Sequence, residues 1–65
     1  MTYSIALPDR GVVSVTSDSE VARGAVAWLL TEGWELDDVN LGTDGHDQVN
    51  LTGEALRIWL ALPCQ

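Results

Sequence analysis

The sequence predicts one small α+β domain of order ββαββα, with a four-stranded, mainly antiparallel sheet and two helices packed on one face. Two pairs of short segments alternate between apolar and polar residues or are rich in β-branched residues, and each pair surrounds turn residues. Each pair is followed by a segment with helical periodicity. A chain of 65 residues is long enough for one domain only, and helices are the natural cover for the apolar face of such a sheet.

The first hairpin is predicted over residues 3–7 and 12–16. Tyr3, Ile5 and Leu7 alternate with smaller residues, which is the period of a half-buried strand. The PDRG stretch at 8–11 is typical of a turn, and the VVSVT stretch after it is typical of a strand.

The first helix is expected to begin after Ser17, because Ser17 and Glu20 have the spacing of a capping box. Its apolar residues fall in one half of the helical wheel, with Trp28 at the margin of that half. Gly33 is expected to end the helix, because glycine adopts the left-handed conformation that commonly follows the last helical turn.

The second hairpin is predicted at about 35–41 and 48–51, with Leu41 facing Val49 and a loop over 42–48. The alternation slips at 37–38, which favours a bulge or a change of direction there. Thr52 is expected to cap a second helix that Pro63 closes. The apolar arc of this helix is too wide for a half-buried helix, so it is expected to be enclosed or to offer apolar surface to another chain.

The TEGWELDDV stretch, residues 31–39, resembles the AEGWELVSV turn of a family of small bacterial domains of unknown function. In that family the turn joins a helix to the next strand. The resemblance covers nine of the 65 residues. It implies a helix, a glycine, a tryptophan and a strand in that order, and it implies no functional residue.

The net charge disfavours nucleic acid and anionic membranes as partners. Ten acids face three arginines and no lysine, for a net charge of −7, so direct binding to nucleic acid or to an anionic membrane is disfavoured. The sequence shows neither a signal peptide nor an apolar run of the roughly 20 residues that span a bilayer, so a soluble, cytoplasmic protein is expected. The only cysteine, Cys64, excludes an intrachain disulfide.

No metal, cofactor or catalytic residue is predicted, and the protein is expected not to be an enzyme. A calcium loop built around residues 44–45 would place Gly42 at its third position and Leu51 at its twelfth, where side-chain oxygens are needed. His46, beside Asp44 and Asp47, has no second histidine or cysteine nearby to complete a transition-metal site. The alternative is an enzyme or a metal protein. A catalytic pocket formed between chains, or a stoichiometric metal, would support it.

Protein binding is the leading hypothesis. Trp28 and Trp34 are candidate aromatic anchors. The candidate acidic face consists of six carboxylates: Glu32, Glu35, Asp37, Asp38, Asp44 and Asp47. Same-face strand residues recur at about 6.7 Å, which is comparable to successive phosphates. The expected function is an inhibitor that occupies a basic nucleic-acid-binding groove of a partner, in the style of phage or mobile-element anti-CRISPR and DNA-mimic proteins.

The alternative function is that of a small structural subunit. It would form a homodimer or larger oligomer through the second helix, with Leu56, Trp59 and Leu60 at the interface. The residues assigned to protein binding also have simpler interpretations that involve no partner. The acids fit a solvated loop, and the three tryptophans fit a core that has no phenylalanine.

Overall fold

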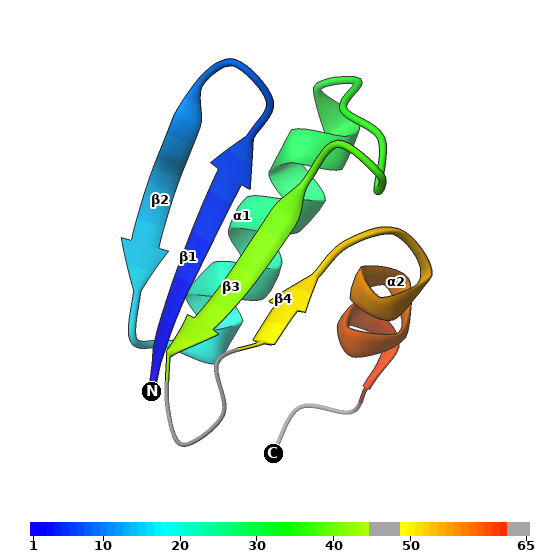
Figure 1. Ribbon diagram of the computed structural model, residues 1–65. Coiled ribbons are helices and arrows are strands. Elements are labelled where there is room, and N and C mark those ends of the chain that lie inside the picture. The colour runs from blue at the N-terminus through cyan, green and yellow to red at the C-terminus, as the bar shows by residue number, and fades with distance from the viewer. Residues whose placement is uncertain (45–48, 63–65) are drawn as a thin grey trace.

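The computed structural model describes residues 1–44 and 49–62 and confirms the predicted α+β class. Its elements are β1 (Thr2–Leu7), β2 (Gly11–Thr16), α1 (Ser19–Thr31), β3 (Asn40–Asp44), β4 (Val49–Leu51) and α2 (Gly53–Ala61). The four strands form one antiparallel sheet of order β2-β1-β3-β4 (Figure 1). Within the described ranges, no helix has the length and apolar character needed to cross a membrane.

The first hairpin forms where it was predicted, and it contains a bulge. Ile5 pairs with Ser14 and Ala6 pairs with Val12, so Val13 is an extra residue on β2. A bulge of this kind bends the strand and increases its twist. β2 is the edge strand beside β1, and the bulge is expected to bend it at its middle.

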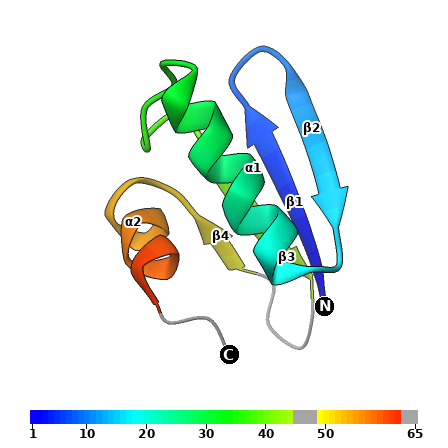
Figure 2. The same ribbon diagram turned by 180° about the vertical axis from the view of Figure 1, so that it is seen from behind.

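Both helices contribute to one core on one face of the sheet. α1 runs obliquely across the back of the sheet, and α2 lies beside it (Figure 2). Tyr3 on β1 and Trp59 on α2 have ring centroids 6.0 Å apart. The buried apolar residues come from every element except β2 and β4: Ile5, Leu7, Ala22, Val26, Leu29, Val39, Leu41 and Leu56.

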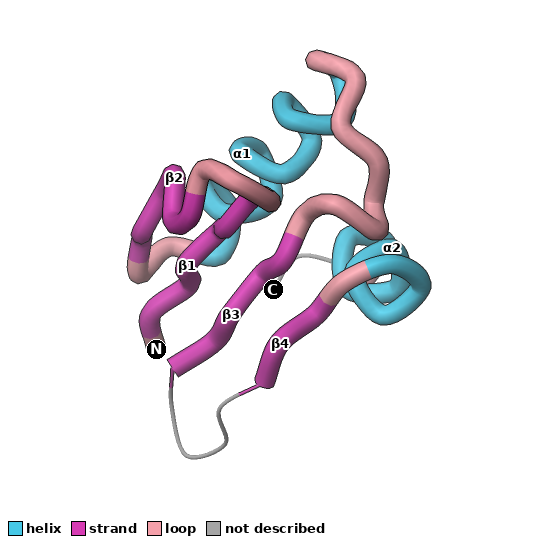
Figure 3. The backbone as a smooth tube through the Cα atoms, turned by 45° about the horizontal axis from the view of Figure 1, so that its top comes forward, coloured by secondary structure: helices cyan, strands magenta, loops and turns pink. Residues whose placement is uncertain are grey.

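The strand predicted at 35–41 is wrong at its start. Residues 35–38 form a turn, in which the Asp38 amide donates to the Glu35 carbonyl at 2.9 Å. The carbonyl of Leu36 instead accepts from the Gly53 amide and from the Thr52 hydroxyl. The backbone of this segment is therefore tied to the start of α2 and not to the sheet, and Figure 3 shows it as a loop.

The register of the second hairpin differs from the prediction by two residues. Leu41 pairs with Leu51 and Thr43 pairs with Val49, and β3 extends to Asp44 along β1. Because side chains alternate with a period of two, this shift leaves every residue on its predicted face. The remainder of the predicted loop, with His46 and Asp47, lies outside the described residues, as do Pro63 and Cys64.

The N-cap of α1 is Asp18 and not Ser17. The Asp18 carboxylate accepts a hydrogen bond from the Glu20 amide at 2.9 Å. Thr52 does precede α2 as predicted, but its side chain makes no capping hydrogen bond to that helix. Its hydroxyl is directed at the 36–37 backbone carbonyls instead.

Candidate functional site

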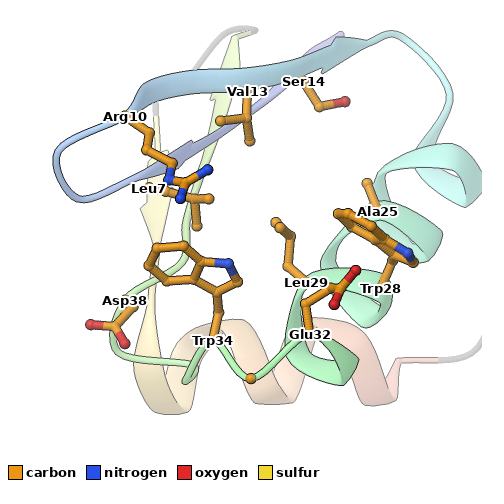
Figure 4. Close-up of a pocket in the computed structure, with 11 residues that line it drawn as sticks. Leu7, Arg10, Val13, Ser14, Ala25, Trp28, Leu29, Glu32, Trp34 and Asp38 are labelled. Carbon is orange, nitrogen blue, oxygen red and sulfur yellow. The ribbon is translucent and has the colours of Figure 1, made fainter.

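A groove of about 950 Å³ opens between the first hairpin and the C-terminal half of α1 (Figure 4). Its volume is in the range of pockets that bind small molecules or side chains. It contains both predicted aromatic anchors and two of the predicted acids. The lining residues are Leu7, Arg10, Val13, Ser14, Ala25, Trp28, Leu29, Glu32, Gly33, Trp34 and Asp38.

The groove exists because α1 and β2 diverge. Figure 2 shows the two elements close together where β2 leads into α1 and apart at the other end of the helix. The bulge contributes a second effect, since Val13 and Ser14 are consecutive and yet both point into the groove (Figure 4). In a regular strand, two consecutive side chains would lie on opposite faces.

The end of α1 fixes the position of Trp34. Gly33 has a φ of 106°, its amide donates to Leu30 and the Trp34 amide donates to Leu29. These two hydrogen bonds define a Schellman motif, which commonly brings the residue after the glycine against the last helical turn. Trp34 and Leu29 accordingly line the same groove.

One arginine lies over the Trp34 ring. The guanidinium carbon of Arg10, from the turn between β1 and β2, is 5.5 Å from the ring centroid. This distance is within the range of a cation–π interaction. The contact joins the first hairpin to the segment that follows α1 and closes one end of the groove.

Trp28 and Glu32 form the opposite wall. They are four residues apart, so their side chains are neighbours on the surface of the helix. The side chain of Trp28 is 60% exposed, and within residues 1–44 and 49–62 Glu32 forms no ion pair. Glu32 is also the C-cap residue, where a negative charge opposes the helix dipole. Its charge therefore has no stabilising role that the fold accounts for.

The other predicted acids do not form one face. Glu35, Asp37 and Asp38 lie in the same connection as Glu32, whereas Asp44 lies at the far end of β3. Asp47 is outside the described residues. Asp38 has a local role, because its carboxylate accepts a hydrogen bond from the Glu35 amide at 3.4 Å.

Two of the three arginines form their contacts outside the groove. Arg57 is paired with Glu54 on α2, and its hydrogen bond to Glu54 lowers the pKa of that carboxyl. Arg23 donates to the backbone carbonyls of Trp59 and Leu60, in the C-terminal turn of α2. In the described part of the connection between α1 and β3, no cation neutralises the acids.

The three residues predicted to form an interface on α2 differ in how deeply they are buried. Leu56 is fully buried in the core, so it offers no surface to a second chain, and the prediction for this residue is corrected. Trp59 and Leu60 are half-buried against the same core. The large apolar residues exposed here are Ile58 on α2, at 52%, and Leu62 directly after it, at 51%. The helix therefore buries Leu56 against its own chain and leaves the side carrying Ile58 exposed.

Neither the groove nor the roles of two arginines were predicted from the sequence. The turn position of Arg10 gave no sign that its side chain would reach Trp34, 24 residues later. Arg23 falls in the half of the helical wheel opposite the apolar residues, and that position does not predict its contact with Trp59. The signal that the sequence does contain is Trp34 directly after the helix-ending Gly33, which predicts a tryptophan packed against the last turn of α1.

The comparisons with known proteins found no match, whether to a family model, to a curated protein or to a solved structure. Among the described residues, no group of three or more histidine, cysteine, aspartate or glutamate side chains is placed to hold a metal ion. The groove brings two tryptophans and two carboxylates together, which is an arrangement suited to binding.

Proposed function

We propose that this protein is a small protein-binding module that recognises a basic segment of a partner through the groove and the acids beside it. The observation that supports the proposal is the placement of Glu32 next to the exposed ring of Trp28, on a wall of the groove and without an ion pair in the described part of the chain. Tryptophan is a favoured interface anchor, and unpaired carboxylates favour a cationic partner.

The proposed partner class is a protein with a basic surface that handles nucleic acid, and binding would inhibit it by covering that surface. The net charge of −7 and the clustering of Glu32, Glu35, Asp37 and Asp38 in one connection support this choice. The phosphate-like spacing expected of a strand does not contribute, because residues 35–38 form a turn.

Immobilised protein and two charge-reversed variants test the proposal. Glu35→Lys changes the cluster next to the groove, and Asp44→Lys makes the same change in net charge at the far end of β3. The partner captured from a host lysate should elute at high salt, because screening shortens the range of charge interactions to about 3 Å at 1 M. It should be lost with Glu35→Lys and retained with Asp44→Lys. Capture that is indifferent to salt and to both reversals would contradict the proposal.

A second candidate function is self-association through α2. The exposed side chains of Ile58 and Leu62 favour it, because they are four residues apart on one side of the helix. Light scattering measures the oligomeric state of the protein and of the Ile58→Glu variant. A dimer that the substitution dissociates would support this function, and a monomer at all concentrations would exclude it.

A further inference from the structure

Two of the three tryptophans each carry an arginine guanidinium over the indole ring. Arg10 lies 5.5 Å from the ring centroid of Trp34, and Arg23 lies 4.8 Å from that of Trp59. Trp28 has no cation and no aromatic partner in the described part of the chain. The chain therefore uses the same pairing twice and leaves one ring of this kind open.

The remaining arginine does not pair with this ring. Arg57 is held by Glu54 on α2, through an ion pair and a hydrogen bond of 2.9 Å from Nε to Oε2. Trp28 is 60% exposed, and Glu32 lies one turn further along the helix. An aromatic face and a free carboxylate thus lie side by side on the groove wall.

We propose that Trp28 and Glu32 together receive one arginine side chain of the partner, and that the residues flanking this arginine lie in the groove. The guanidinium stacks on the indole of Trp28 and donates to the carboxylate of Glu32. This inference rests on the proposed function and specifies the partner's binding segment. Arginine suits the site because its planar guanidinium can stack and donate two hydrogen bonds at once, which lysine cannot do.

The groove lining is consistent with this occupant. The lining contains two carboxylates, those of Glu32 and Asp38, and one guanidinium, that of Arg10, so its net charge is −1. Val13 and Ala25 offer apolar surface to residues beside the bound arginine. A second copy of the chain is a poor occupant, because it would bring another net charge of −7.

The test uses short synthetic peptides with a central arginine between leucines, and matched peptides with lysine or glutamine in its place. Binding is followed by fluorescence anisotropy and by the indole N–H signals of Trp28, Trp34 and Trp59 in nuclear magnetic resonance. The arginine peptide is expected to bind about tenfold more tightly than the lysine peptide. It should shift the Trp28 signal and leave that of Trp59, which lies away from the groove, in place.

Four variants localise the site. Trp28→Ala and Trp28→Leu should each weaken the arginine peptide about tenfold, and the exposure of this residue makes unfolding by either change unexpected. Glu32→Gln should weaken it about five- to tenfold. Glu35→Gln removes the same charge outside the groove and should change affinity less than about twofold.

Equal binding of the lysine and arginine peptides, with equal losses for Glu32→Gln and Glu35→Gln, would overturn the inference. The proposed function would survive that result, since net charge alone would then explain the partner. The absence of any peptide binding, or a shift confined to Trp59, would also overturn it. If the intact partner is captured equally well at low and high salt and by the charge-reversed variants, that result would instead contradict the proposed function itself.

Discussion

Arg23 on α1 contacts Trp59 on α2 in two ways at once. Its Nη1 donates to the backbone carbonyl of Trp59 at 2.9 Å, and its guanidinium carbon lies 4.8 Å from the centroid of the Trp59 ring. The same nitrogen reaches the carbonyl of Leu60 at 3.0 Å. A positive charge at the C-terminal end of a helix is favourable, so Arg23 supplies from another element the cation that the last turn of α2 lacks.

The first prediction is that Arg23→Ala lowers the free energy of unfolding by about 2–3 kcal/mol, because charged hydrogen bonds and a stacked cation are lost together. Urea denaturation measures the effect. Arg57→Ala, which removes an exposed arginine from α2 itself, is the matched control and should have a much smaller effect. Equal effects of the two substitutions would contradict a special role for Arg23.

The second prediction distinguishes the two candidate caps of α1. Asp18→Ala should lower the free energy of unfolding by about 1 kcal/mol, because the Glu20 amide loses its acceptor. Ser17→Ala should change it by less than about 0.5 kcal/mol. Thermal unfolding of the two variants provides the comparison, and a larger loss for Ser17→Ala would restore the capping box predicted from the sequence.

The third prediction concerns two glycines with opposite outcomes. Gly24→Ala should stabilise the protein by about 0.5–1 kcal/mol, because the residue lies inside α1 and an added methyl group meets nothing within 4 Å. Gly53→Ala should destabilise it by about 1–2 kcal/mol, because Gly53 has a φ of 58°. Denaturant midpoints measure both. Stabilisation by Gly53→Ala would show that α2 does not begin with a left-handed residue.

A double substitution separates the two causes at Gly53. A methyl group there would lie 2.6 Å from Oδ1 of Asp37. In an Asp37→Ala background, Gly53→Ala should therefore be less costly than in the native sequence, with the backbone cost remaining. An unchanged cost would mean that Asp37 moves aside freely.

The fourth prediction concerns pH. Because the hydrogen bond from Arg57 lowers the pKa of Glu54 in the folded protein, the pair stabilises the fold at neutral pH. This contribution is lost as the pH falls through the lowered pKa. Carboxyl chemical shifts followed during an acid titration should give Glu54 a pKa below the ordinary glutamate range. Arg57→Ala should return that pKa to the ordinary range, and an identical titration in both proteins would disprove the pairing.

Much of the fold was predictable because it depends on local patterns. The alternation of Tyr3, Ile5 and Leu7 identified β1, and Gly33 identified the end of α1. The error at 35–39 arose from a competing non-local bond, since the Leu36 carbonyl pairs with the start of α2. No periodicity in the sequence reports a hydrogen bond of that kind.

The candidate site was only half predictable. Trp28 and Trp34 were selected by residue type, and the structure places both in one groove. Burial of Leu56 could not be separated from exposure of Ile58 by the helical wheel, because the apolar arc of α2 is wide enough to include both. The role of Arg10 depends on where the first hairpin lies relative to the end of α1, which is a tertiary relationship.

The pairing of β1 with β3 has a consequence for how the chain folds. Residues 2–6 of β1 meet residues 40–44 of β3, so the two central strands are far apart in sequence. The first hairpin and α1 together lack Leu41 and Leu56, which complete the core. A fragment that stops before β3 should therefore remain largely unfolded, and the intact chain should unfold in a single cooperative transition whose rate-limiting step is the closure of this long loop.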